Sequence, residues 1–306
     1  MLSEVFYWLL NMSIIGSVAG MIILLLRRWK KIPKSLVYLL WVVPFIRLVI
    51  PFGAANRFSL MSLVSQFATR AIVVYEGSSI FPDFIFSNTF MAADSYFPIV
   101  YKTAVLENVF RIASAIWAVV SLAAILTAVI LYMFTKAEIK GAALYKDNIY
   151  ISDRITSPAL YGMIHPKIII PKSVVGEDLK YVTLHEKAHT LRHDNVWRCV
   201  AIFVCCIHWF NPMCWIFLKY FFEDMELSCD NKVLRKMDKE EAKGYAYAIL
   251  NAAARRNMFV AAFGGAKIKV RMENILSYRK LTWISTVAFA VLVTTIIIVL
   301  ITNAAP

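Results

Sequence analysis

The sequence predicts an α-helical multi-span membrane protein with an α+β domain inserted between its last two spans. Of the 306 residues, 60% are hydrophobic and only 17% are charged, a balance too apolar for an ordinary globular domain in water. Long uncharged runs alternate with segments rich in Lys and Arg, and the more polar region 135–281 separates the last two runs. These observations indicate a membrane-spanning chain with one substantial domain outside the bilayer.

The formal charge of +13 reflects topology rather than nucleic-acid binding. Lys and Arg concentrate in the cytoplasmic loops of membrane proteins, which places the basic segments inside. We therefore expect the lipid bilayer as a partner and no direct contact with nucleic acid.

Residues 1–134 form the predicted N-terminal membrane region, with three spans. The first, Val5–Leu26, is uncharged and long enough to cross a hydrocarbon core of about 30 Å. It precedes the basic cluster Arg27–Lys34, whereas a cleaved signal peptide carries its positive charge first. The N-terminus is therefore expected outside and the basic cluster inside.

The second and third spans frame an expected external loop. The second span, residues 35–53, is weaker because Pro44 can kink it and Arg47 must find a partner or reach the interface. Residues 54–111 mix apolar pairs with polar residues and contain few basic ones, as expected of an external loop. The third span, Ile112–Phe134, returns to the inside.

The C-terminal segment 282–306 holds a fourth span and a short external tail. Region 135–281 should then face the cytoplasm as an inserted domain. All five cysteines lie in this region and none forms a CxxC pair, which fits reduced structural thiols in that compartment: Cys199, Cys205, Cys206, Cys214 and Cys229.

One apolar stretch inside this domain, residues 197–222, is long enough to span a membrane. Asn211 and Pro212 interrupt it and His208 lies inside it, which favours a helical hairpin that turns there and packs against the spans. A single crossing would move the rest of the domain outside, against the basic residues that follow. We expect a buried or re-entrant hairpin, and the spanning alternative stays open.

The segment Leu179–Asn195 carries a metal-binding pattern, LKYVTLHEKAHTLRHDN. Residues four apart lie on one face of a helix, so His185 and His189 can direct imidazole nitrogens at one zinc ion. Glu186 can act as general base on a water molecule but is not placed to ligate. This H-E-x-x-H pattern predicts a zinc-dependent hydrolase, although so short a pattern also occurs by chance on ordinary helices.

A catalytic zinc site needs a third protein ligand. His193 lies a further turn along and is rotated away from His185, so it is expected to be a polar helix-face residue. His165 adjoins a proline and His208 lies in the apolar hairpin, so both are expected to be structural. Carboxylates remain as candidates.

The segment Phe221–Leu234 supplies two carboxylates. Glu226 and Asp230 lie four apart and share a helix face. Glu226 can complete a His-His-Glu set, and Asp230 can hold the outer ring nitrogen of a ligating histidine. An exposed acidic helix start is the alternative.

Three segments, LHEKAHTLRHDN, HWFNPMCW and EDMELSCDNKVL, occur in this order and at this spacing, after SPALYGMIHPKIIIP. Together they resemble the membrane metallopeptidase domain of the BlaR/MecR-type antirepressors, bacterial signal transducers that switch on β-lactam resistance genes. With the span order, the similarity covers almost the whole chain. The resemblance implies a gluzincin-like zinc peptidase, with Zn²⁺ held by His185, His189 and Glu226, Glu186 as general base and Asp230 as a supporting carboxylate.

The resemblance also implies a function. It is that of a membrane-embedded zinc endopeptidase in transmembrane signalling, which cleaves a cytoplasmic protein, such as a winged-helix repressor or itself, in response to an external stimulus. A homodimer is implied on the same ground. A housekeeping peptidase and a non-catalytic receptor or scaffold stabilised by zinc remain as alternatives. Glu186 separates the scaffold from an enzyme, since a structural zinc site needs no carboxylate there.

The β-lactam-responsive members of that family continue into a penicillin-binding domain, whereas this sequence stops at NAAP. The S-x-x-K string at Ser277–Lys280 lies at the expected cytoplasmic end of the fourth span and is attributed to chance. We therefore expect this chain to form no covalent adduct with penicillins.

Residues 167–171, KIIIP, form a short β-branched run suited to a strand. Such a strand either receives a substrate as an added strand at a sheet edge or is an ordinary buried strand.

Overall fold

The computed structural model describes residues 2–29, 32–50, 54–60, 62, 84–85, 100–101, 104–139, 141–163, 165–254, 268–280 and 282–304. Within these ranges three helices are long and apolar enough to cross a membrane: α1 (Leu2–Arg27), most of α5 (Ala104–Glu138) and α12 (Trp283–Ile301). They cover the first, third and fourth spans expected from the sequence.

The second expected span is broken into two short helices, α2 (Lys34–Leu40) and α3 (Val42–Val49). The break lies at Trp41. Pro44 has no N–H to donate to the carbonyl of Leu40, so the continuous hydrogen-bond ladder of an α-helix cannot pass this point. The single long span therefore becomes two consecutive short helices.

Arg47 finds its partner at the end of another helix. Its Nε donates to the carbonyl oxygen of Leu300 at 2.8 Å and its Nη1 to Oδ1 of Asn303 at 2.7 Å, and its Nη2 binds the carbonyl of Thr302. Only 1% of Arg47 is exposed. The buried guanidinium thus satisfies carbonyls at the C-terminus of α12, where the helix dipole favours a cation.

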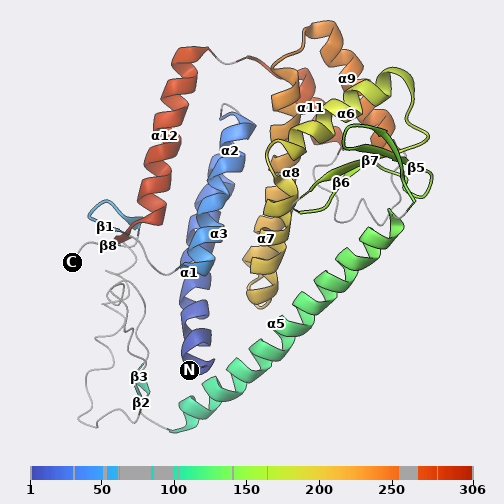
Figure 1. Ribbon diagram of the computed structural model, residues 1–306. Helices are drawn as coiled ribbons and strands as arrows, with labels where there is room; N and C mark the ends of the chain where they lie inside the picture. Colours follow the sequence, from blue (N-terminus) through green and yellow to red (C-terminus); the bar gives the residue numbers. More distant parts are fainter. Residues whose placement is uncertain are drawn as a thin grey trace.

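Helices α7 (Asp194–Ile207) and α8 (Pro212–Leu234) follow one another around a turn at His208–Asn211. The Asn211 side chain caps α8 by accepting from the Met213 amide at 2.9 Å. Figure 1 shows α7 and α8 beside the upright helices α1, α2 and α3, and buried residues from all five helices and from α12 form one apolar core.

Small residues let α1 approach its neighbours closely. A side chain at Gly20 would overlap the ring of Phe217 on α8, and one at Gly16 would lie 2.7 Å from Leu48 on α3. Such close packing of small residues is a common basis of helix association in membranes.

The α+β part contains a four-stranded sheet in the order β4 (Ala143–Lys146), β5 (Ile149–Ser152), β7 (Lys167–Pro171) and β6 (Ala159–Tyr161). Strand β7 is the KIIIP run, and it pairs with β5 in parallel and with β6 in antiparallel orientation. Since both of its edges are occupied, the hypothesis that this strand receives a substrate is wrong, and the ordinary buried strand is correct.

Helices α6 (Gly176–Thr190), α9 (Lys239–Ala254) and α11 (Ile268–Leu276) pack with the end of α8 into a second core. Helix α8 belongs to both cores. Its residues up to Met225 pack in the first core, the membrane-helix core formed with α1, α2, α3, α7 and α12. Cys229 and the residues after it pack against α6, α9 and α11. Glu226 and Asp230 therefore lie near the junction of the two cores.

Most of the expected external loop, residues 54–111, lies outside the described residues. Short pairs are described: β1 (Ala55–Asn56) lies parallel to β8 (Asn303–Ala304), and β2 (Phe84–Ile85) lies antiparallel to β3 (Val100–Tyr101). Helix α5 begins at Ala104, inside the segment expected as loop, and reaches the sheet region at its far end (Figure 1).

Candidate metal centre

Helix α6 presents His185 and His189 on its buried face. Their exposed fractions are 4% and 3%, and the Nε2 atoms of the two rings lie 3.2 Å apart. The ring planes are close to perpendicular, at 89°. One helical turn therefore brings two imidazole nitrogens to a common point, as the spacing predicts.

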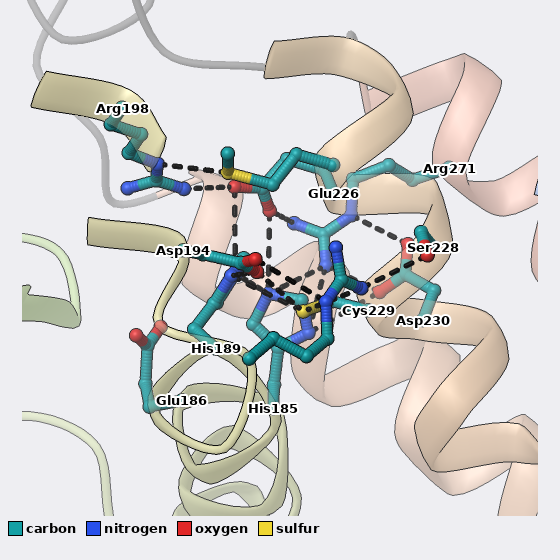
Figure 2. Close-up of polar contacts among 12 residues, drawn as sticks. His185, Glu186, His189, Asp194, Arg198, Glu226, Ser228, Cys229, Asp230 and Arg271 are labelled. Carbon is teal, nitrogen blue, oxygen red and sulfur yellow. Dashed lines mark hydrogen bonds and ion pairs between the residues drawn. The ribbon is translucent and has the colours of Figure 1, made fainter. Parts of the chain in front are cut away.

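Helix α8 adds Glu226 at the same point. Its Oε2 lies 3.3 Å from Nε2 of His185, and its Oε1 lies 3.6 Å from Nε2 of His189. The donor atoms of the three residues all lie within 4.8 Å of one another (Figure 2). Two imidazoles and one carboxylate, all buried, form a donor set that fits a divalent transition metal.

The outer nitrogen of His185 is held by a residue that the sequence reasoning did not name. Its Nδ1 lies 2.9 Å from the hydroxyl of Tyr245 on α9, and this hydroxyl donates to Oδ1 of Asp230 at 2.6 Å. Asp230 itself is 3.4 Å from the same Nδ1. Asp230 thus supports His185 mainly through the Tyr245 hydroxyl, whereas the sequence predicted a direct contact.

The outer nitrogen of His189 contacts Asp194, also missed from the sequence. Its Nδ1 lies 2.7 Å from Oδ2 of Asp194. Helix α6 ends at Thr190, and His193 adopts a left-handed conformation (φ 54°) that turns the chain into α7. The expectation that His193 lies on a helix face is therefore wrong, because His193 lies in the turn between α6 and α7. The same turn places Asp194, at the start of α7, against the preceding helix.

Two arginines neutralise the carboxylates on α8. Arg271 on α11 donates to both oxygens of Asp230, from Nε at 2.9 Å and Nη2 at 2.6 Å, and its Nη1 lies 3.3 Å from Glu226. Arg198 on α7 contacts the other oxygen of Glu226 at 2.7 Å. The helix Ile268–Leu276 also contains Lys269 and Glu273, so no local sequence signal marks Arg271 as the buried partner.

These contacts set the protonation states. Burial alone would raise the pKa of Glu226, but positive charge on His189, hydrogen bonds from both histidines and Arg271 hold it well below its usual range. Burial is likewise outweighed at Asp230, where Arg271 and the neighbouring His185 lower the pKa to about 2. Both carboxylates are therefore ionised at neutral pH, as metal ligation and its support require.

A second donor group adjoins the first on the far side of His189. Cys229 Sγ lies 3.2 Å from Nδ1 of His189 and 3.4 Å from Oδ2 of Asp194. Arg192 already supplies a cation here, with its Nε 3.3 Å from Asp194 and its Nη1 3.5 Å from Cys229. We therefore interpret this group as a set of hydrogen-bonding partners that support His189. Cys229 takes part in these contacts and is not only a packing residue.

Glu186 stands apart from this network. Figure 2 draws its carboxylate to the side of His189, without dashed contacts. Within the described residues its carboxylate makes no hydrogen bond or ion pair, so the carboxylate oxygens are available to a reactant. The histidines expected to be structural, His165 and His208, belong to neither donor group, and His208 is fully buried with its Nδ1 3.1 Å from the carbonyl of Val204.

Asp230→Asn should weaken metal binding by about 10–100-fold, the range typical of partners that orient metal ligands. The amide keeps the shape but loses the charge that holds Tyr245 and Arg271 in place. Chelator competition on the purified chain measures the change. Asp238→Asn removes the same charge at an exposed position and should leave the affinity unchanged; equal affinities for both variants would contradict the supporting role.

Comparison with known proteins places the chain in a family. The family model described as "BlaR1 peptidase M56" matches residues 7–279. A "Regulatory protein BlaR1" from Bacillus licheniformis is 36% identical over 102 residues, which cover 32% of this chain and 17% of that protein. One from Staphylococcus aureus is 32% identical over 144 residues, covering 43% and 25%, respectively.

A "Methicillin resistance mecR1 protein" from Staphylococcus aureus is 29% identical over 122 residues, which cover 38% of this chain and 21% of that protein. The matched segments thus span a quarter or less of the length of these curated relatives. The three apolar helices and these relatives together indicate a membrane protein.

Proposed function

The chain belongs to the BlaR1 peptidase M56 family of metallopeptidases, and from this membership we propose that it is a membrane-embedded zinc endopeptidase acting in transmembrane signalling. The observation that carries the proposal is the convergence of His185, His189 and Glu226 within 4.8 Å in a buried site. The domain around it is proposed to be gluzincin-like.

Zinc is the metal that this donor set favours. Two imidazoles and one carboxylate are the ligands of a known class of catalytic zinc sites that keep a position open for a reactant. The outer ring nitrogens contact Tyr245 and Asp194, and each Nε2 is directed toward Glu226, although Arg271 Nη2 also lies 3.3 Å from Nε2 of His185. A bound zinc ion would supply Lewis-acid polarisation of the scissile carbonyl and would lower the pKa of water.

Glu186 is proposed as the general base. It follows His185 directly, its carboxylate is unengaged within the described residues, and it can accept the proton that an attacking water loses. It can then return this proton to the leaving amine. Asp230, Asp194 and Tyr245 take no part in the proposed proton transfer; they orient the two imidazoles.

The substrate is proposed to be a cytoplasmic protein. The curated relatives carry the names "Regulatory protein BlaR1" and "Methicillin resistance mecR1 protein", which favours a regulatory substrate such as a winged-helix repressor, or the peptidase itself. Strand β6 forms one edge of the sheet and contacts α6, so an extended substrate segment could pair there. We also propose a homodimer, which measurement of the oligomeric state of the purified chain tests.

The proposed topology has the N-terminus outside and the zinc region in the cytoplasm. We expect a cysteine at Lys187, an exposed position of α6, to be protected from a membrane-impermeant thiol reagent in intact cells and to be labelled after lysis. A cysteine at Asp83, outside the described residues, should be labelled in intact cells. The background needs the five native cysteines replaced. The opposite labelling pattern would reverse the topology.

A further inference from the structure

We propose that Tyr38 of α2 is a positioning residue for His189 and acts through Asp194. The orientation of the His189 ring would then depend on a helix of the membrane-helix core. The inference rests on the proposed function, because it takes His189 as a ligand. It adds a residue from a distant part of the chain to the support of the metal centre.

A continuous hydrogen-bond chain joins the three side chains. The Tyr38 hydroxyl donates to Oδ1 of Asp194 at 2.9 Å, and Oδ2 of the same carboxylate is 2.7 Å from Nδ1 of His189. Asp194 is 1% exposed, so water does not replace these donors readily. The rotation of the carboxylate is therefore set by Tyr38 and Arg192 at Oδ1 and by His189 and Cys229 at Oδ2.

The ring of Tyr38 is itself held in place. It stacks on Phe221 of α8 with ring centroids 5.4 Å apart and an interplanar angle of 17°. The Arg192 guanidinium lies 4.2 Å from the ring centroid, and its Nε is 3.3 Å from Oδ1 of Asp194. The ring is therefore packed between α8 and the guanidinium of Arg192, and these contacts position the hydroxyl that α2 presents to Asp194.

A second buried carboxylate ties the same membrane helices to α8. Asp224 accepts hydrogen bonds from Nε1 of Trp41 at 2.9 Å and from Nε of Arg27 at 2.8 Å. It precedes Glu226 by two residues on α8. The end of α2, through Trp41 directly after it, is therefore anchored to the helix that carries Glu226, and Tyr38 of α2 is anchored to the carboxylate that orients His189.

A displacement of α2 would consequently reach the metal centre through Asp194. If the Tyr38 hydroxyl withdraws, Asp194 keeps Arg192 as a partner and can rotate toward it, which weakens the hydrogen bond that orients the His189 ring. Partners of this kind affect both metal affinity and ligand geometry.

The test compares Tyr38→Phe with Tyr220→Phe in the full chain. Tyr220 lies at the same helix interface, with Arg27 4.4 Å from its ring centroid, but its hydroxyl makes no hydrogen bond within the described residues. Tyr38→Phe should weaken zinc binding by about tenfold, the effect of one lost hydrogen bond to a charged group, and should shift the visible absorption bands of the Co²⁺-loaded chain. Tyr220→Phe should change neither.

A double-mutant cycle separates positioning from general destabilisation. In an Asp194→Asn background, Tyr38→Phe should cause no further loss of zinc affinity, because the route to His189 is already broken. Additive losses, or a Tyr38→Phe chain with wild-type zinc affinity and Co²⁺ spectrum, would overturn the inference. A wild-type chain that binds no zinc would instead overturn the proposed function, so the two failures are distinguishable.

Discussion

A Glu186→Gln chain is expected to keep its metal and to lose proteolysis by about 10²–10⁴-fold, the usual contribution of a general base. The amide has nearly the same shape as the carboxylate but cannot accept the proton. Glu186 is not among the three converging donors, so the metal site should persist. Cleavage of a co-expressed repressor, or self-cleavage, measures activity, and metal analysis of the same sample measures occupancy.

The matched control is Glu177→Gln. Glu177 lies in the first turn of the same helix, α6, and is exposed, so the same chemical change there should leave both activity and metal content unaltered. Unchanged cleavage by Glu186→Gln would contradict the mechanism. A chain that binds zinc but has no proteolytic activity in its wild-type form would instead favour the scaffold alternative, in which zinc is structural and no general base is needed.

Glu226→Ala should abolish metal binding at low free zinc, with a loss greater than the 10–100-fold or so expected for outer partners such as Asp230. The change removes one of three protein ligands and also leaves Arg271 and Arg198 without their carboxylate. Because unpaired buried charge destabilises a fold, Glu226→Gln, which keeps the size and an oxygen acceptor, is needed as a second variant.

The control for this ligand is Glu223→Ala, one turn earlier on α8, where the carboxylate pairs with Arg27 instead of facing the histidines. It should retain full zinc occupancy. Full occupancy in both Glu226 variants would remove this residue from the ligand set.

Helical periodicity predicts those parts of the metal centre in which two residues share one face of a helix. His185 and His189 lie four apart on one helix, as do Glu226 and Asp230 on another, and the fold brings the two faces together. Asp194 was missed because its contact depends on the left-handed turn at His193, which periodicity does not describe.

The remaining supports depend on tertiary packing. Tyr245 and Arg271 come from α9 and α11, and no local pattern says which face of these helices meets α6 or α8. Pro44 predicts a disturbance of the second span, and the structure places the break at Trp41, three residues earlier. Hydropathy alone predicts neither the division of this span into two helices nor the burial of Arg47 against the end of α12.

X-ray absorption at the zinc edge of the loaded, purified chain identifies the atoms that bind the metal. We expect one zinc ion with only nitrogen and oxygen ligands, at about 2.0–2.2 Å, from His185, His189 and Glu226. A sulfur ligand at about 2.3 Å would contradict it. Such a signal would place the metal in the neighbouring group of His189, Asp194 and Cys229 instead.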